Sequence, residues 1–322
     1  MKIVVIDGSA LNPGDLSWNA LEEFGSLTVH DRTPEDQIVE RARDAEIVFV
    51  NKARLTRAMI ERLSGLRYIG VLATGYDVVD IAAARDAGIT VTNVPAYGTA
   101  SVAQFVFALI LELCSHVAIH DQAAKSGEWS RSPNFAYWKV PLIELAGKTI
   151  GIVGYGRIGR EVANIALTMR MLVLASSSGA SPATGRDLSA AQIEWAETAE
   201  IFRRADFVSL HCPLTRETRG MVNRSTLNQM KPHAFLINTA RGALVVEQDL
   251  ADALNEGRIA GAALDVLTVE PPLPDNPLLS ARNCIVTPHI AWASLEARGR
   301  LLKTAVDNLR AFLAGRPVHV VS

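Results

Sequence analysis

The chain has 322 residues, 49% of them hydrophobic, and a formal net charge of -2 at pH 7. This length and apolar content predict a globular protein of about two domains and argue against a disordered chain. The charge leaves no basic surplus for a phosphate backbone, so we expect no nucleic-acid partner.

The cysteines and the apolar stretches indicate the compartment. Cys114, Cys212 and Cys284 are far apart and have no C-x-x-C spacing, so we expect neither a disulfide framework nor a metal site. The apolar run at the N-terminus is interrupted by Asp7 and is too short for a signal peptide. Residues 102–113 fall short of a membrane span. We therefore expect a soluble, cytoplasmic protein without a membrane partner.

Apolar runs alternate with helical stretches over the first 98 residues. The predicted strands are residues 2–6, 27–30, 46–50, 68–71 and 90–93. A helix is expected to begin near Asp80 and to end at Gly88. This alternation predicts a parallel sheet covered on both faces. Since this part lacks a phosphate-binding glycine pattern, we assign it by elimination to the substrate.

Two loops follow strands of this first sheet at their carboxyl ends, where ligands bind in such folds. Ala73, Thr74 and Gly75 follow the fourth predicted strand, and their backbone N–H groups could hold a carboxylate. The alternative is a turn without a ligand. Lys52 follows the third predicted strand, and it is either an anion ligand or a solvated charge.

A proline and glycine segment, residues 95–98, marks the expected crossing to a second domain. It leads into one long predicted helix that ends around residues 126–127. The following arm, residues 128–139, contains aromatic side chains without a helical or strand period. They are Trp129, Phe135, Tyr137 and Trp138. We expect this arm to be buried against another subunit or packed on its own domain.

Three spaced glycines follow an apolar run at residues 149–153 and precede a helical stretch. Gly154 permits a tight turn, Gly156 permits close approach of a ligand, and Gly159 permits close packing of the helix on the strand. The helix start offers unpaired N–H groups to a pyrophosphate. The pattern predicts a dinucleotide site; the alternative is a structural turn without a ligand.

A second alternation of strands and helices begins here. Its predicted strands are residues 149–153, 171–175, 207–210, 234–238, 259–264 and 284–286. Six parallel strands fit two mononucleotide-binding halves. A last helix, residues 294–313, is expected to return to the first domain. Arg241, Glu270 and His289 follow strand ends; each alone has an ordinary structural explanation, but together they indicate one ligand-binding crevice.

The chain now resembles the D-isomer-specific 2-hydroxyacid dehydrogenases. The matching motifs occur in family order along the whole chain, at residues 73–80, 154–159, 211–215, 238–242, 263–266 with 270–271, and 288–291. The resemblance implies two doubly wound parallel-sheet α/β domains. These would be a flavodoxin-like substrate domain, residues 1–98 and 294–322, and an inserted Rossmann dinucleotide-binding domain, residues 99–293.

The resemblance also implies which residues act in hydride transfer to a 2-oxo acid, and in what role. His289 would be the general acid, and Glu270 would orient its ring and favour the protonated form. Arg241 would bind the substrate carboxylate and polarise its carbonyl group. Backbone N–H groups of Thr74 and Gly75 would hold the carboxylate from the other domain, and cleft closure would assemble both halves.

Further contacts follow from the same resemblance. Asp265 would accept a hydrogen bond from the nicotinamide carboxamide, and Cys212 with Pro213 would line the adenine pocket. The expected cofactor contacts are Gly154, Gly156, Arg157, Ile158, Gly159, Ser176, Ser177, Ser178, Cys212, Pro213, Thr218, Ala240, Arg241, Asp265, His289 and Ala291. The expected substrate contacts are Lys52, Ala73, Thr74, Gly75, Arg241 and Trp292.

Residues 291–293, and Asn51 with Lys52, resemble the glycerate dehydrogenase or glyoxylate and hydroxypyruvate reductase branch of the family. Trp292 would either narrow the pocket for these short acids or anchor the two domains. The alternatives are a dehydrogenase of the D-lactate or D-3-phosphoglycerate type and a dinucleotide-sensing, corepressor-like protein. Glu270 separates the chain from formate dehydrogenases, which have Gln at that position.

The end of the second strand of the Rossmann domain bears on the choice of cofactor. Residues 174–179 contain no acid that would select a free ribose hydroxyl, and they include Ser176, Ser177 and Ser178. Serine hydroxyls, with Arg157 or Arg186, suit a 2′-phosphate. We therefore expect NADP(H) to be preferred and NAD(H) to be possible. The family expectation is a homodimer, with the aromatic arm and the helix of residues 101–125 at its interface.

Overall fold

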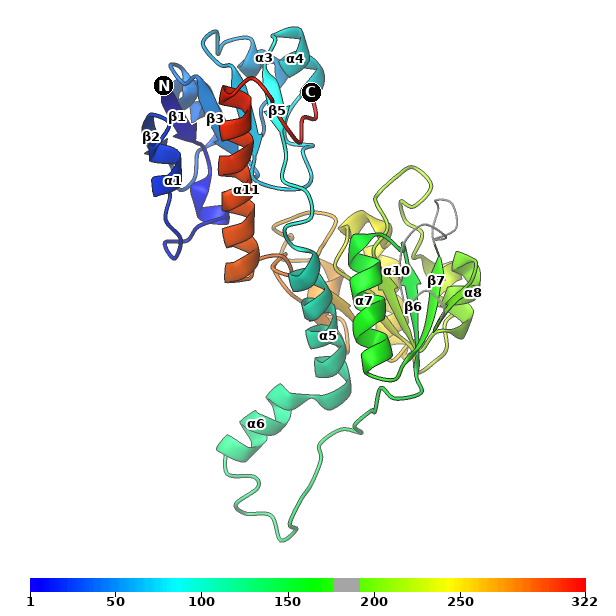
Figure 1. Ribbon diagram of the computed structural model, residues 1–322. Helices are drawn as coiled ribbons and strands as arrows, with labels where there is room; N and C mark the ends of the chain where they lie inside the picture. The colour runs from blue at the N-terminus through cyan, green and yellow to red at the C-terminus, as the bar shows by residue number, and fades with distance from the viewer. Residues whose placement is uncertain (177–191) are drawn as a thin grey trace. The chain divides into compact units, whose positions relative to one another are not determined.

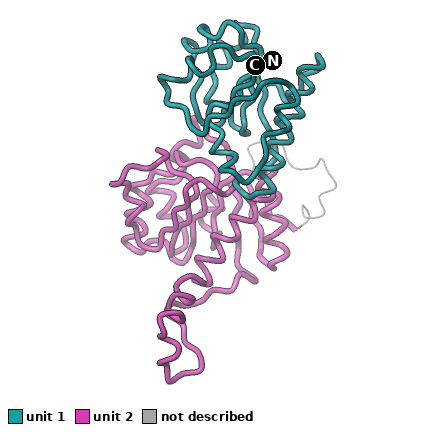
Figure 2. Tube along the Cα trace, turned by 90° about the vertical axis from the view of Figure 1, so that its left-hand side faces the viewer, with its two compact units in different colours: residues 1–98, 292–322 teal, residues 99–291 magenta. Residues whose placement is uncertain are grey.

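The computed structural model describes residues 1–176 and 192–322, and the chain divides into two compact units. Unit 1 comprises Met1–Gly98 and Trp292–Ser322, and unit 2 comprises Thr99–Ala291 (Figure 2). Each unit contains a parallel sheet with helices, as the α/β class predicts. The second boundary between the units lies before Trp292, two residues earlier than the sequence suggested.

The sheet of unit 1 has the strand order β2-β1-β3-β4-β5, which is the flavodoxin-like order. Its strands are β1 (Lys2–Val5), β2 (Ser26–Val29), β3 (Ile47–Val50), β4 (Tyr68–Val71) and β5 (Thr90–Thr92). The central strands β3 and β4 are buried along their whole length, because helices cover both faces of the sheet. This burial explains their uninterrupted apolar sequences.

The α-helices of unit 1 are mostly short. They are α1 (Asn19–Glu22), α2 (Ile38–Ala42), α3 (Arg57–Ile60), α4 (Ile81–Asp86) and α11 (Leu295–Leu313). Asp80 caps α4 by accepting a hydrogen bond from the Ala83 N–H. The long helix α11 belongs to unit 1 (Figure 1). It buries Leu301 and Leu309 in the same hydrophobic cluster as Tyr68 of β4.

Over its described residues, the sheet of unit 2 has the order β12-β11-β10-β9-β6-β7-β8. Its strands are β6 (Thr149–Val153), β7 (Leu172–Ser176), β8 (Ile193–Trp195), β9 (Phe207–Leu210), β10 (Phe235–Asn238), β11 (Gly261–Leu264) and β12 (Cys284–Val286). Numbered within the unit, this is the Rossmann order with one strand added at the end. The sequence missed β8, because only Ile193 of its three residues is buried at this sheet edge.

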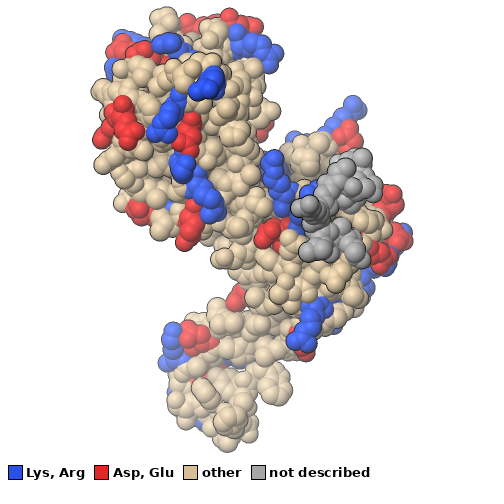
Figure 3. All heavy atoms as spheres, in the orientation of Figure 1, with Lys and Arg blue, Asp and Glu red and all other residues tan. Residues whose placement is uncertain are grey.

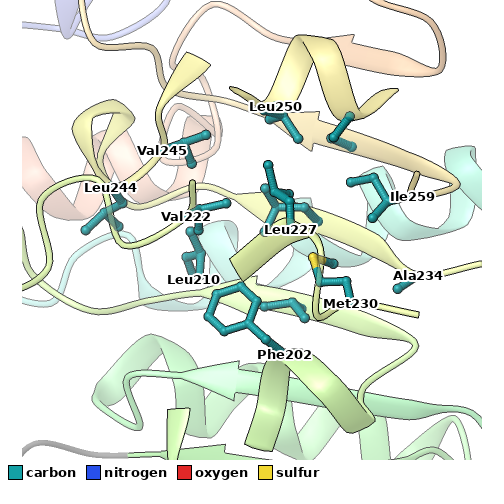
Figure 4. Close-up of a cluster of buried hydrophobic side chains, with 14 of the residues drawn as sticks. Phe202, Leu210, Val222, Leu227, Met230, Ala234, Leu244, Val245, Leu250 and Ile259 are labelled. Atoms are coloured by element: carbon teal, nitrogen blue, oxygen red, sulfur yellow. The ribbon is translucent and has the colours of Figure 1, made fainter. Parts of the chain in front are cut away.

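Side chains alternate across the sheet of unit 2 and form a hydrophobic cluster on each face. Leu210 and Leu236 join Phe202 of α8 (Thr198–Arg204) in one cluster, which Figure 4 shows in part. Phe207 and Phe235 stack in the other cluster, with ring centroids 5.3 Å apart. The helices of this unit are α5 (Thr99–Ser115), α6 (Val117–Lys125), α7 (Arg157–Thr168), α8 (Thr198–Arg204), α9 (Arg224–Leu227) and α10 (Glu247–Asn255).

The predicted long helix is two helices. His116 adopts a left-handed conformation with φ 48° and ψ 45°, and the axes of α5 and α6 differ by 56°. The sequence did not predict this break, because the left-handed residue is a His and not a Gly, and no Pro interrupts the helical stretch. Within the described residues, α5 and α6 satisfy the length and hydropathy test for a membrane span only as this bent pair, and no single helix does so.

The aromatic arm projects from unit 2 together with α6 (Figure 1). Phe135 is 94% exposed, Trp138 is 69% exposed and Trp129 is 54% exposed. The alternative that this arm packs on its own domain is therefore wrong. The Trp129 indole N–H donates to the Phe135 carbonyl oxygen, so the arm has an internal conformation although its rings are exposed.

Candidate active site

The turn after β6 requires its glycines. Gly154 has φ +100°, and a Cβ atom there would lie 2.5 Å from the backbone nitrogen of Cys212. At Gly159 a Cβ would lie 2.4 Å from the Gly154 carbonyl oxygen, which confirms that this residue permits close packing of α7 on the strand. At Gly156 a Cβ would meet nothing within 4 Å among the described residues, so a ligand can approach the backbone there.

The N-terminus of α7 suits an anion. Gly156 is its N-cap and provides no side-chain cap, so the first N–H groups of the helix can face a phosphate. Arg157 and Ile158 form the first turn. The turn and this helix start together fit the pyrophosphate of a dinucleotide.

Other predicted cofactor contacts lie at the same edge of the parallel sheet. The Ser176 carbonyl oxygen at the end of β7 accepts from the N–H groups of Gly154 and Tyr155 at 3.0 and 3.1 Å. The Ser176 hydroxyl accepts from the Thr198 hydroxyl at 3.1 Å. Ser177, Ser178 and Arg186 lie outside the described residues.

The loop after β9 is held by Thr218. Its hydroxyl donates to the Pro213 carbonyl oxygen and accepts from the Thr215 N–H, both at 2.7 Å. The Thr218 hydroxyl hydrogen is thus used within the loop. The backbone of Cys212 packs against Gly154, and burial raises the pKa of the Cys212 thiol. This loop therefore borders the glycine turn.

Arg241 lies in a turn after β10 that Asn238 stabilises. The Asn238 side chain accepts from the Ala240 N–H at 3.0 Å and donates to the Arg241 carbonyl oxygen at 2.9 Å. The Arg241 guanidinium is exposed and donates to the Ala240 carbonyl oxygen at 2.7 Å. A Cβ at Gly242 would lie 1.9 Å from the carbonyl carbon of Leu267, so this turn packs directly on the segment that leads to Glu270.

His289 and Glu270 form a pair. The Nδ1 atom of His289 lies 2.6 Å from Oε2 of Glu270, while Oε1 of Glu270 accepts from the Leu267 N–H at 2.9 Å. Both carboxylate oxygens are therefore engaged. With Nδ1 bonded to the carboxylate, Nε2 is the ring nitrogen that can exchange a proton with a substrate.

Asp265 holds the loop that carries His289. Its carboxylate accepts from the Thr287 hydroxyl at 2.7 Å and from the N–H groups of Ile290 and Ala291 at 2.9 and 2.8 Å. Burial raises the pKa of Asp265, and these hydrogen bonds oppose that rise. His289 has φ 57°, a conformation uncommon outside glycine, and the bonds on both sides stabilise it.

The predicted substrate contacts of unit 1 lie after β3 and β4. Ala73 is half-buried, and the Thr74 hydroxyl donates to the Val94 carbonyl oxygen at 2.9 Å. Within the described residues, the backbone N–H groups of Thr74 and Gly75 have no acceptor in hydrogen-bond range. They can therefore serve a ligand anion.

Trp292 belongs to unit 1 and is partly buried against its hydrophobic cluster. Its ring meets Tyr97 edge to face, with centroids 6.0 Å apart. Lys52 is exposed, and its backbone N–H donates to Asp7. The sequence did not identify Asp7 or Asn238 as residues that shape the site. For Asp7, the available signal was an acid placed directly after an apolar run.

Comparison with known proteins assigns the chain to a family. A model of the family described as "D-isomer specific 2-hydroxyacid dehydrogenase, NAD binding domain" matches residues 107–291. The chain is also 49% identical to the hydroxypyruvate reductase of Blautia hydrogenotrophica, with both chains covered completely. The chain belongs to this family. The dehydrogenase resemblance of the sequence motifs is thus confirmed.

This dehydrogenase also resembles a second curated relative and two solved structures. It is 39% identical to a glycerate dehydrogenase of Methylorubrum extorquens, over 99% of this chain and 98% of the relative. Its fold matches an acyclic imino acid reductase in complex with NADPH and D-Arg, with a TM-score of 0.84, 34% identity and complete coverage of both chains. The TT0316 protein of Thermus thermophilus matches with a TM-score of 0.86 at 35% identity, also over both whole chains.

Proposed function

We propose that this dehydrogenase reduces hydroxypyruvate and glyoxylate to D-glycerate and glycolate. The observation that carries the proposal is the His289 and Glu270 pair at 2.6 Å, with the Arg241 turn packed on the segment that leads to Glu270. A proton donor beside a carboxylate-binding guanidinium is what reduction of a 2-oxo acid requires. The names of the hydroxypyruvate reductase and glycerate dehydrogenase relatives support these substrates.

A bound nicotinamide dinucleotide supplies the hydride. His289 gives a proton from Nε2 to the carbonyl oxygen of the substrate, and Glu270 holds the ring through Nδ1. The Arg241 guanidinium binds the substrate carboxylate and polarises the carbonyl group. In unit 1, the N–H groups of Thr74 and Gly75, which have no acceptor among the described residues, are the proposed donors for a carboxylate. Asp265 keeps the His289 loop in place.

NADPH is the proposed preferred cofactor. Residues 174–179 contain no acid that would repel a 2′-phosphate. The acyclic imino acid reductase, which matches over the whole chain, is described as a complex with NADPH. Ser176 ends β7, and its carbonyl oxygen bonds the glycine turn, so the segment that would select the phosphate starts beside the dinucleotide site.

A homodimer in the cytoplasm is the proposed working form. Four apolar side chains of α6 and the arm are more than half exposed: Val117, Trp129, Phe135 and Trp138. Such a concentration of aromatic surface is typical of a subunit interface, and a second copy of the same surface is the simplest partner. The cysteines Cys114, Cys212 and Cys284 are free thiols, which supports a reducing compartment.

The test of function is a substrate panel with the purified protein. Hydroxypyruvate, glyoxylate, pyruvate and 3-phosphohydroxypyruvate are each assayed with NADPH and with NADH. We expect kcat/KM for hydroxypyruvate or glyoxylate to exceed that for pyruvate at least about tenfold, and NADPH to exceed NADH. A higher value for pyruvate would assign a lactate-type enzyme. Cofactor binding without any turnover would favour the corepressor-like alternative.

A further inference from the structure

The most heavily bonded carboxylate of unit 1 lies where β1 ends. Asp7 is 8% exposed, and three consecutive backbone N–H groups donate to it. The Asn51 N–H donates to Oδ1 at 2.7 Å, and the N–H groups of Lys52 and Ala53 both donate to Oδ2, the latter at 2.8 Å. Charge-assisted bonds of this kind are among the stronger hydrogen bonds in proteins. The turn after β3 is therefore folded around one carboxylate.

The sheet register brings Asp7 to this turn. Val5 of β1 pairs with Phe49 of β3, and the Ile6 N–H donates to the Phe49 carbonyl oxygen at 3.0 Å. The next residue, Asp7, then lies opposite the end of β3. Since the strands are parallel, both ends lie at the carboxyl edge of the sheet, where ligands bind in such folds.

Asn51 connects the same turn to the loop after β4. Its side chain is 3% exposed and donates through Nδ2 to the Leu72 carbonyl oxygen at 2.9 Å. Leu72 directly precedes Ala73 and Thr74, the proposed substrate-binding loop. The Leu55 N–H also donates to the Val78 carbonyl oxygen at 2.7 Å, beyond that loop. The two loops are therefore joined by hydrogen bonds on both sides of Thr74.

Lys52 is the residue at the centre of the turn, and its side chain is exposed. Within residues 1–176 and 192–322 its ammonium group lies within 4.0 Å of no carboxylate oxygen. Burial raises the pKa of Asp7, while the three N–H groups and Lys52 oppose that rise. An ammonium group without a protein partner at the ligand edge is available for a substrate carboxylate.

We propose that Asp7 is a positioning residue that holds Lys52 toward the substrate. The carboxylate of Asp7 shapes the turn of residues 51–53, and this turn presents the Lys52 ammonium beside the Thr74 and Gly75 N–H groups to the carboxylate of the 2-oxo acid. The inference rests on the proposed function. It adds Asp7 and Asn51 to the residues on which substrate affinity depends.

Asp206 of unit 2 is a buried carboxylate, like Asp7, but it lies outside the proposed substrate site. Its carboxylate is also 8% exposed, accepts from the Thr149 N–H at 2.8 Å and pairs with Lys231 at 2.7 Å. Thr149 begins β6, and Asp206 directly precedes β9, so this carboxylate lies at the amino edge of its sheet. Asp206 therefore serves as a matched control for the purely structural loss of a buried carboxylate.

The test compares Asp7→Asn, Lys52→Met and the double variant. The amide of Asn has one acceptor oxygen, so its NH2 group must face an N–H group of the turn. We expect Asp7→Asn to raise the KM for hydroxypyruvate about tenfold, with kcat and the KM for NADPH changed less than about threefold. Lys52→Met should raise the KM at least as much. The double variant should match Lys52→Met alone, because Asp7 acts through Lys52.

Two controls accompany these variants. Arg54→Met removes an exposed charge from the same loop and should leave the KM unchanged. Asp206→Asn should lower Tm without changing the KM. An unchanged KM in Asp7→Asn, or additive effects in the double variant, would overturn the proposal. If Asp7→Asn does not fold, Asp7→Ala takes its place; if neither folds, an unchanged KM in Lys52→Met overturns the proposal.

Failure of the proposed function can be separated from failure of this inference. If the wild-type protein reduces neither hydroxypyruvate nor glyoxylate, the proposed function is wrong. Calorimetric titration with oxalate in the presence of NADPH then tests the turn directly, because it requires no turnover. A Kd raised about tenfold by both Asp7→Asn and Lys52→Met supports the role of Asp7, and an unchanged Kd in either variant contradicts it.

Discussion

Three carboxylates each accept hydrogen bonds from a loop that carries a proposed site residue. Asp265 bonds the N–H groups that follow His289, Glu270 bonds the ring of His289 itself, and Asp7 bonds the turn that carries Lys52. Because a carboxylate has two acceptor oxygens, one side chain can fix several loop donors at once. These three acids therefore position residues of the proposed site.

Substitutions of His289 and Glu270 should lower kcat to different extents. His289→Gln removes the proton donor and should lower kcat for hydroxypyruvate about 10²- to 10⁴-fold. Glu270→Gln should lower it less, by about tenfold to a hundredfold. The reason is that one amide cannot accept from both the Leu267 N–H and the His289 ring. Steady-state kinetics measures both effects.

The control for this pair is cofactor binding. Both variants should bind NADPH within about threefold of the wild-type Kd, measured by fluorescence, because the glycine turn is unchanged. A larger loss of kcat in Glu270→Gln than in His289→Gln would contradict the assigned roles. So would a kcat in His289→Gln equal to that of the wild type.

The sequence identified polar residues after strand ends more readily than it identified their supports. Arg241 and His289 stand out because charged or titratable groups directly follow apolar strands. Asn238 does not, since a buried amide at the end of a strand has no distinctive pattern. Its two hydrogen bonds to the Arg241 turn become visible only when the turn is folded.

At the scale of elements, strands buried on both faces were predictable, and edges and breaks were not. β3 and β10 consist of buried residues, so an apolar run marks each of them. β8 exposes two of its three residues and therefore resembles a loop. The break at His116 depends on one left-handed residue, for which the sequence gives no glycine or proline signal.

The close packing of α7 on β6 predicts that a side chain at Gly159 lowers both stability and cofactor affinity. Gly159→Ala places a Cβ 2.4 Å from the Gly154 carbonyl oxygen, so the start of α7 must move away from the turn. Overpacking of this kind costs about 1–3 kcal/mol. We expect a lower Tm and a Kd for NADPH raised at least about tenfold, because the helix N–H groups move with the turn. Thermal unfolding and fluorescence titration measure the two effects.

Gly299 is the matched control, since it lies within α11 and a Cβ there meets nothing within 4 Å among the described residues. Gly299→Ala should raise stability by about 0.4–1 kcal/mol, because alanine has less conformational freedom to lose on folding. NADPH affinity should stay unchanged. Equal effects of the two substitutions on the Kd would show that the glycine turn tolerates a shift of α7.

At the scale of the whole molecule, charge does not gather by sign on the face that Figure 3 shows. Basic and acidic side chains are interspersed on the described part of this face, which agrees with the small net charge of -2. Apolar groups are distributed less evenly, because the aromatic side chains of the arm are exposed together. The sequence predicted only that this arm is buried against another subunit or packed on its own domain, and the choice between the two required the exposures of its rings in the structure.

The proposed homodimer can be tested at the exposed arm. Phe135 is 94% exposed, so Phe135→Asp should leave the fold of the monomer intact while it places a charge in the proposed interface. A central aromatic residue of an interface commonly contributes about 2 kcal/mol or more, so we expect the dimer Kd to rise about 30-fold or more. Sedimentation velocity measures this as a shift from twice the chain mass of 34.8 kDa toward the chain mass itself.

Val318→Asp provides the control for the dimer, because Val318 is 45% exposed on unit 1 and lies outside the arm. This variant should sediment like the wild type. A wild-type protein that sediments as a monomer at micromolar concentration would contradict the dimer. A dimer that Phe135→Asp leaves unchanged would assign the interface to another surface, and the exposed arm would then need a partner other than a second copy of this chain.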